Sequence, residues 1–104
     1  MQNADYVASY IDGFDEKKFL GDRKTQDAVE RCLQRITEAA IKLGDEAENL
    51  IPGYPWKDVR GLGNRLRHEY DSIDAKQIWR IARDELPALA QRCRIALDGF
   101  GQQS

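Results

Sequence analysis

The stretch that decides the fold is TQDAVERCLQRITEAAIKLG, residues 25–44 of a chain of 104 residues. Its apolar residues recur at intervals of three and four, the spacing of one face of an α-helix rather than the alternation of a β-strand. The chain is expected to bury this stripe, which comprises Ala28, Val29, Cys32, Leu33, Ile36, Ala39, Ala40 and Leu43. Gly44 follows the stripe and is typical of a helix end. The longest predicted element is therefore an amphipathic helix.

The same helical period continues on both sides of this segment, and strand signals are nearly absent. Upstream, a short first helix is predicted to end at Gly13, with an inner face of Ala4, Val7, Ala8 and Ile11. Asp15 is then expected to cap a brief helical turn over residues 16–20, which ends at Gly21. Downstream, a short helical piece over residues 45–51 leads into a turn-rich break at residues 52–55.

Two further helices are predicted after this break. Pro55 suits the first turn of a fourth helix, which runs through Trp56 toward His68. Asp74, with Gln77 three residues later, forms a capping-box pattern at the start of the last helix. The inner face of the last helix is predicted to be Ile78, Ala82, Leu86, Leu89, Cys93 and Ala96.

The last helix contains Pro87, which predicts a kink near Asp84 or Leu86. We expect this helix to end at Gly99 and residues 99–104 to form a loose tail. The length suits one domain over residues 1–104. The predicted fold is therefore all-α, a four- or five-helix bundle with short connections.

Composition excludes several classes of function. Hydrophobic residues make up 41% of the chain, so it is not compositionally disordered. Both cysteines, Cys32 and Cys93, fall on apolar helix positions and are expected to be buried. With only one histidine, no metal site of the usual spacing is predicted, and no cofactor is expected. No stretch has the length of a transmembrane helix, and no secretory signal is present, so no membrane partner and a cytoplasmic location are expected.

Charge is unevenly distributed along the chain. The formal net charge is −2, which does not indicate nucleic-acid binding by the whole chain. The segment 57–68 is different, because it contains one acid and four basic residues: Lys57, Arg60, Arg65 and Arg67. A solvated helix face explains this segment as readily as an anion-binding face does.

The fourth helix separates two kinds of residue around its axis. At 100° per residue, Val59, Leu62 and Leu66 lie within one narrow arc, which is predicted to face the core. The opposite arc carries Arg60, Asn64, Arg67 and His68. An imidazole can move a proton at neutral pH, and a guanidinium can hold a phosphate with two hydrogen bonds. This set suits cleavage of a phosphodiester without a metal, although a basic face also suits binding of an acidic partner.

The stretch GLGNRLRHEY, residues 61–70, resembles the motif of the HepT-like ribonuclease toxins of the HEPN group. In that family an Arg, usually followed by Asn, is separated from His-x-Tyr by four residues. Here Asn64 matches the Asn, and His68-Glu69-Tyr70 matches His-x-Tyr. The resemblance extends over nearly the whole chain, through Thr25–Val29 with Glu38–Ala40, Pro55-Trp56, Ile73-Asp74, Ile78-Trp79 and Asp84–Pro87.

The chain departs from this motif at one position, because Gly63 stands where the family has its arginine. A glycine cannot bind a phosphate. Arg60 and Arg67 are the candidates to replace the missing side chain, with Arg67 favoured, and Arg65 is a weaker candidate. If none of them does so, the chain keeps the fold and the partner but not the activity.

The resemblance also implies partners. HepT-like proteins pair as homodimers whose motifs face one cleft, and a nucleotidyltransferase-type antitoxin holds them in check. In some members that antitoxin transfers AMP to the motif tyrosine, which is Tyr70 here. An aromatic partly buried at a helix end is an equally good interpretation of Tyr70. Trp56 and Trp79 are expected to be packing residues, although Trp56 lies close enough to the motif to stack on a base.

Two hypotheses follow for function. The first is a metal-independent endoribonuclease toxin that acts on RNA, in which His68 serves as general base or acid, Asn64 orients the reacting group and an arginine stabilises developing charge. The second is a catalytically silent helical module that binds a nucleotidyltransferase antitoxin or a nucleotide. Gly63 favours the second hypothesis, and the set Asn64, His68 and Tyr70 favours the first.

Overall fold

Helices account for most of the residues that the structure describes, and short turns connect them. The computed structural model describes residues 2–68 and 74–103, with side chains for residues 2–67 and 74–96. The elements in chain order are α1 (Gln2–Ile11), α2 (Glu16–Leu20), α3 (Arg23–Leu43), α4 (Asp45–Leu50), α5 (Trp56–His68), α6 (Ala75–Arg80), the π-helical turn η2 (Ile81–Glu85) and α7 (Leu86–Gln103). No strand occurs in these residues, and the predicted all-α bundle is confirmed.

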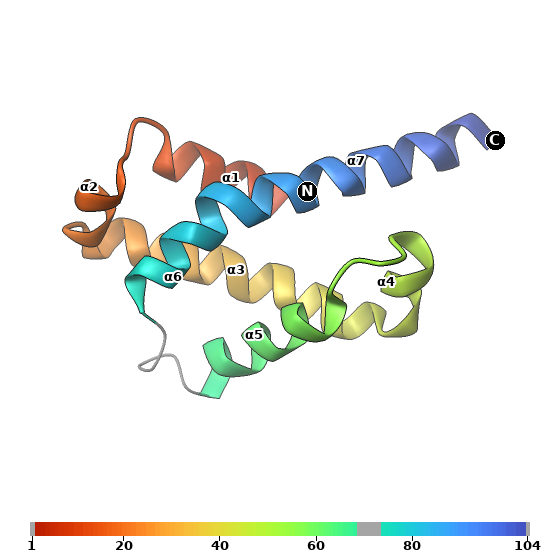
Figure 1. The fold of residues 1–104 in the computed structure, drawn as a ribbon, viewed down its shortest axis with the longest axis horizontal. Coiled ribbons are helices and arrows are strands. Elements are labelled where there is room, and N and C mark those ends of the chain that lie inside the picture. The colour runs from red at the N-terminus through yellow and green to blue at the C-terminus, as the bar shows by residue number, and fades with distance from the viewer. Residues whose placement is uncertain (1, 69–73, 104) are drawn as a thin grey trace.

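Helix α3 is the central element of the bundle. Figure 1 shows α1 and the continuous α6–η2–α7 segment on one side of it and α5 on the other. The Asp22 carboxylate accepts a hydrogen bond from the Thr25 backbone N–H at 3.1 Å, a cap that places the start of α3. Gly44 ends the helix with a φ of 55°, a conformation that favours glycine. The predicted stop at Gly44 is therefore confirmed.

The inner face of α3 is narrower than the sequence pattern predicted. Val29, Cys32, Leu33, Ile36 and Ala40 are buried as expected, and the polar Thr37 is buried with them. Ala39 is exposed and Leu43 is 43% exposed, so their predicted burial is wrong. Ala8 on α1 is also exposed, unlike its neighbours Ala4 and Val7. Ala8 and Ala39 lie at the edges of the buried arcs of their helices, whereas Leu43 lies within the arc but is the last residue of α3.

The core draws side chains from both sides of α3. The largest side chains that are fully buried are Phe19, Leu33, Leu66, Ile78, Val7 and Val29, which come from five different helices. Phe19 packs against Trp79 with ring centroids 5.2 Å apart. Trp56 is also buried, and its indole Nε1 donates to the Ile51 carbonyl at 3.1 Å. Both tryptophans are therefore packing residues, and burial of Trp56 leaves it no open face for a base.

The last helical segment contains an irregular turn just before Pro87. Residues Ile81–Glu85 form a single π-helical turn, in which the Leu86 N–H donates to the Ile81 carbonyl. Proline has no N–H to donate, and a π-turn is one of the ways in which a helix accommodates that loss. The irregularity predicted near Asp84 or Leu86 is thus present, and its form is a π-turn. The predicted end at Gly99 is wrong, because α7 continues to Gln103.

Helix α5 approaches α3 closely at Gly63. A Cβ added to Gly63 would lie 2.7 Å from the Thr37 Cβ and 2.9 Å from its Oγ1, closer than real Cβ atoms come to their neighbours. The Thr37 hydroxyl itself donates to the Gln34 carbonyl at 3.0 Å, which fixes it in place. Gln34 Nε2 donates to the Leu66 carbonyl at 3.3 Å, a second link between the two helices. Gly63 is therefore a packing residue.

This contact predicts opposite effects for two neighbouring glycines. Replacement of a helical glycine by alanine normally stabilises the helix by up to about 1 kcal/mol. We expect this gain for Gly61→Ala, since nothing lies within 4 Å of its added Cβ. For Gly63→Ala we expect a net loss of about 1–3 kcal/mol, because overpacking costs more than the propensity returns. Urea denaturation of both variants measures the difference, and equal stabilisation of both would contradict the packing role of Gly63.

Candidate functional site

Helix α5 has three distinct sides in the structure. Leu66 and Gly63 are buried on the side that faces α3. Asp58, Leu62 and Arg65 lie on a second side, which lines an open groove. The remaining side carries exposed residues. The sequence predicted only a core face and one opposite face for α5. The structure adds a side that faces the groove.

Arg60 links helix α5 to the end of α3 and to α4. Its Nη1 lies 3.0 Å from Glu48 Oε1, and its Nη2 donates to the Gly44 carbonyl at 2.8 Å. The Arg60 side chain is 28% exposed, whereas that of Glu48 is 50% exposed. The Gly44 carbonyl also accepts a hydrogen bond from the Ala47 backbone N–H at 3.2 Å, so Arg60 is the second donor at this helix junction. This guanidinium is thus occupied within the fold.

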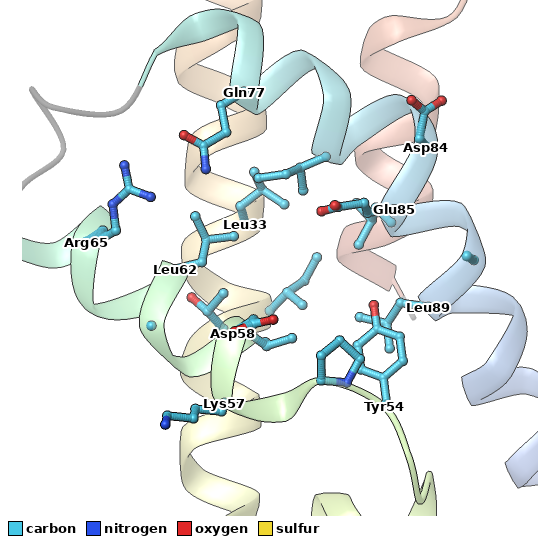
Figure 2. Close-up of a pocket in the computed structure, with 18 residues that line it drawn as sticks. Leu33, Tyr54, Lys57, Asp58, Leu62, Arg65, Gln77, Asp84, Glu85 and Leu89 are labelled. Carbon is cyan, nitrogen blue, oxygen red and sulfur yellow. The ribbon is translucent and has the colours of Figure 1, made fainter.

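The groove beside α5 is formed by α5 on one wall and by α6, η2 and the start of α7 on the other (Figure 2). Its volume is about 920 Å³, within the range of small-molecule sites. Leu33 and Ile36 of α3 lie at its base, so the floor is apolar. Its charged and amide side chains are Lys57, Asp58 and Arg65 from α5 and Gln77, Asp84 and Glu85 from the opposite wall, and the hydroxyl-bearing Thr37 and Tyr54 also line it.

Tyr54 lies at one end of this groove, in the turn before α5. Its ring is 5.1 Å from the Trp56 ring, and the guanidinium of Arg92 lies 5.5 Å from its centroid. Arg92 also donates to the Pro52 carbonyl at 3.1 Å, which attaches the turn to α7. Burial raises the pKa of the Tyr54 phenol, and the Glu85 carboxylate raises it further. Tyr54 is therefore a neutral hydrogen-bonding group at physiological pH.

The structure describes only part of the predicted site. Arg65 lines the groove and is partly buried. Asn64 and Arg67 are exposed and do not line it. His68 is the last residue of α5, and its side chain lies outside the described part of the structure. Tyr70 lies outside the described residues altogether.

The helical register nevertheless relates the backbone of His68 to the groove. His68 follows Gly61 by seven residues, which returns its Cα to within about 20° of Gly61 around the helix axis. Gly61 lines the groove. The Cα of His68 therefore continues the row of groove residues by one turn beyond Arg65.

Two structural searches bear on other classes of protein. Among the side chains that the structure describes, in residues 2–67 and 74–96, no three His, Cys, Asp or Glu are grouped so that they could hold a metal ion. Within the same residues, no helix has the length and apolar character needed to cross a membrane. Cys32 is buried and Cys93 is partly buried, and burial raises the pKa of both thiols.

Comparison with known proteins identifies the family. The model of the ribonuclease HepT-like family matches residues 1–95. The chain belongs to the HepT-like ribonuclease family. The named relatives are consistent with this membership. "Probable ribonuclease HepT" of Thermococcus cleftensis is 34% identical over 71 residues, which cover 68% of this chain and 64% of the relative.

Two longer matches agree with this membership. "Putative RNase MJ1380" of Methanocaldococcus jannaschii is 28% identical over 95 residues, or 91% of this chain and 87% of the relative. "Putative RNase TTE0752" of Caldanaerobacter subterraneus is 27% identical over 97 residues, or 93% of this chain and 87% of the relative. No solved structure matches the chain. The resemblance inferred from residues 61–70 is thus confirmed.

One pattern in the sequence indicates the groove, although it is not part of the family motif. Asp58, Leu62 and Arg65 recur at intervals of four and three, so they share a row on α5. Recognising that this row faces a second wall requires the position of η2 beside α5, which no local pattern provides. The place of Gln77 in the groove was not predicted either. Its spacing from Asp74 indicated a helix cap, whereas in the structure its side chain lines the groove.

The two arginines on the other sides of α5 should differ in their effect on stability. Arg60→Ala removes the hydrogen bond to the Gly44 carbonyl and the ion pair with Glu48. We expect a loss of about 1 kcal/mol, because the ion pair is partly exposed and the Gly44 carbonyl keeps its bond to the Ala47 N–H. Arg67→Ala, the matched control on the exposed side, should change stability by less than about 0.5 kcal/mol. Thermal and urea denaturation compare them, and equal losses would show that the Arg60 contacts add nothing.

Proposed function

We propose that this chain is a metal-independent endoribonuclease toxin of a toxin–antitoxin system, which cleaves RNA through His68. The observation that carries the proposal is the match to the ribonuclease HepT-like family over residues 1–95, which includes the stretch from Asn64 to Tyr70. The register of α5 supports it, because the backbone of His68 continues the row of groove residues.

The proposed reaction is an attack of a ribose 2′-hydroxyl on the adjacent phosphorus. The bond between O2′ and phosphorus forms as the bond from phosphorus to the 5′-oxygen breaks, which leaves a cyclic phosphate and a 5′-hydroxyl. His68 either accepts the 2′-proton as general base, with water protonating the leaving 5′-oxygen, or protonates that oxygen as general acid, with water accepting the 2′-proton. Asn64 orients the reacting group. Single-stranded or loop RNA fits this reaction, because its backbone can adopt the in-line geometry.

We also propose that two copies form the functional unit. Apolar side chains remain uncovered on the first and last helices, where Tyr6 is 41%, Tyr10 is 42% and Ile95 is 62% exposed. A pair related by a two-fold axis would cover such side chains and bring two motif helices to one shared cleft. The pair would act in the cytoplasm, where its RNA substrate is.

A nucleotidyltransferase-type antitoxin is the proposed second partner. Tyr70 follows His68 by two residues, so transfer of AMP to its hydroxyl would place phosphate charge beside the cations of α5. That charge would compete with RNA for the same cations. Mass spectrometry of the chain co-expressed with its neighbouring gene product would detect the added nucleotide on Tyr70.

One observation favours a second candidate function. Gly63 is buried against Thr37 and leaves no room for the family's arginine. A chain that lacks this group and has no substitute would be a catalytically silent module that binds the antitoxin or a nucleotide. The two functions differ in whether purified protein cleaves RNA.

The first test is cleavage of RNA by the parent chain and by His68→Ala. We expect the parent to cleave single-stranded RNA in the presence of EDTA and the variant to lose at least about 100-fold in rate, since general acid–base catalysis contributes about 10²–10⁴-fold. Gln91→Ala, on the exposed side of α7, is the matched control and should cleave like the parent. Growth arrest on expression should follow the same pattern. Absence of cleavage by the parent would favour the silent module.

The second test is the mass of the particle in solution. Light scattering at micromolar concentration should give about twice the chain mass of 11.9 kDa. The reason is the exposed apolar surface of α1 and α7, which pairing would remove from water. A mass of one chain at this concentration would contradict the homodimer and leave each groove to act alone.

A further inference from the structure

We infer that the scissile phosphate binds at the end of the groove where Arg65 of α5 and Gln77 of α6 lie on facing walls. Arg65 then stabilises the charge on the phosphate in place of the arginine that the motif has at position 63. This inference rests on the proposed ribonuclease function and adds to it the residues that hold the reacting group. It departs from the sequence-based expectation, which favoured Arg67. Three observations carry it: the space around Gly63, the charges in the groove and the register of α5.

The first observation is that neither position 63 nor Arg60 can supply the cation. A Cβ at position 63 would meet Thr37 at 2.7 Å, so a long side chain has no path from that position past α3. The Arg60 guanidinium already contacts Glu48 and the Gly44 carbonyl at 3.0 and 2.8 Å. Recruiting Arg60 to RNA would break both contacts and leave the carbonyl without that donor.

The second observation is the distribution of charge along the groove. Asp58 of α5 and Glu85 of η2 both line its middle, and Figure 2 shows the Glu85 carboxylate directed toward α5. Two carboxylates repel a phosphate, so the middle of the groove is a poor place for one. At the end of the groove next to α6, Figure 2 shows the Arg65 guanidinium on one wall and the Gln77 amide on the other. That end offers a guanidinium and an amide to an anion.

The third observation is the spacing between Arg65 and His68. The two residues are three apart in α5, about 4.5 Å along the axis and about 60° around it, which makes them neighbours on the helix surface. Arg67 is about 160° from Arg65 around the same helix, and it is exposed. A phosphate in contact with Arg65 therefore lies beside the last turn of α5. A phosphate in contact with Arg67 lies on the far side, away from the groove.

The chemistry of the two side chains suits a phosphodiester. The Arg65 guanidinium can donate two parallel hydrogen bonds to the non-bridging oxygens, whose charge rises as the 2′-oxygen attacks. The Gln77 amide can donate a third from the opposite wall. Both side chains are partly buried, so their bonds to the phosphate are less screened than those of an exposed arginine would be. Arg65 is therefore assigned as a catalytic residue and Gln77 as a binding residue.

The test compares Arg65→Ala, Arg65→Lys, Gln77→Leu and the matched control Arg67→Ala in the full chain. The substrate is a fluorophore-labelled single-stranded RNA that contains every dinucleotide step, and kcat/KM is measured across a range of pH. We expect Arg65→Ala to lose about 10²–10³-fold, the usual cost of removing one such donor. Arg65→Lys should lose less, because it keeps the charge but not the bidentate geometry. For Gln77→Leu we expect kcat/KM to fall about tenfold, and for Arg67→Ala we expect it to stay within about threefold of the parent value.

Two controls separate this inference from the function on which it rests. The pH profile of Arg65→Ala should keep the shape of the parent's profile at a lower level, since His68 still transfers the proton. Circular dichroism and thermal denaturation should show each variant folded. Parent-like cleavage by Arg65→Ala, with His68→Ala inactive, would overturn the assignment of Arg65 and leave the ribonuclease function standing. A larger loss in Arg67→Ala than in Arg65→Ala would also overturn it, and a parent that never cleaves would remove the function and the inference together.

Discussion

The close approach of α5 to α3 at Gly63 is the constraint on which the rest of the site depends. The backbone of α5 lies against the Thr37 side chain with no space for a Cβ between them. Thr37 is itself buried and hydrogen-bonded to the preceding turn of α3, so it cannot move aside without leaving its hydroxyl unpaired. The two helices are thus held in one register, and the bond from Gln34 to the Leu66 carbonyl strengthens it at the C-terminal end of α5.

That constraint determines which residues of α5 can act together. With Gly63 and Leu66 turned toward α3, the row of Asp58, Leu62 and Arg65 is turned toward η2, and the groove forms between them. The π-turn before Pro87 contributes to the same groove, because it carries Asp84 and Glu85 on the opposite wall. Packing keeps position 63 as glycine, and the same packing turns Arg65 toward the groove. Under the proposed function, the cation at the site would therefore come from Arg65.

The sequence predicted the parts of this structure that depend on local chemistry. The period of three and four residues identified α3, and Asp15 and Gly44 marked real helix ends. Pro87 indicated the irregular turn. The sequence did not predict features that depend on how helices meet. Thr37 is buried where Gly63 allows α5 to approach it, and Leu43 is exposed although it lies on the apolar arc of α3. The placement of Arg65 has the same origin, since a helical wheel cannot show that a second wall stands beside α5.

The central claim is that RNA is cleaved at the end of the groove beside the last turn of α5. The most direct measurement is a crystal structure of the chain with an RNA oligomer that carries a 2′-deoxy sugar at the cleaved nucleotide, which prevents attack on the phosphate. We expect the scissile phosphate to accept hydrogen bonds from Arg65 and Gln77, with the His68 imidazole next to the C2′ atom that carries the attacking hydroxyl in RNA. A phosphate bound instead by Arg67 on the exposed side of α5, without contact to Arg65 or Gln77, would contradict the proposal.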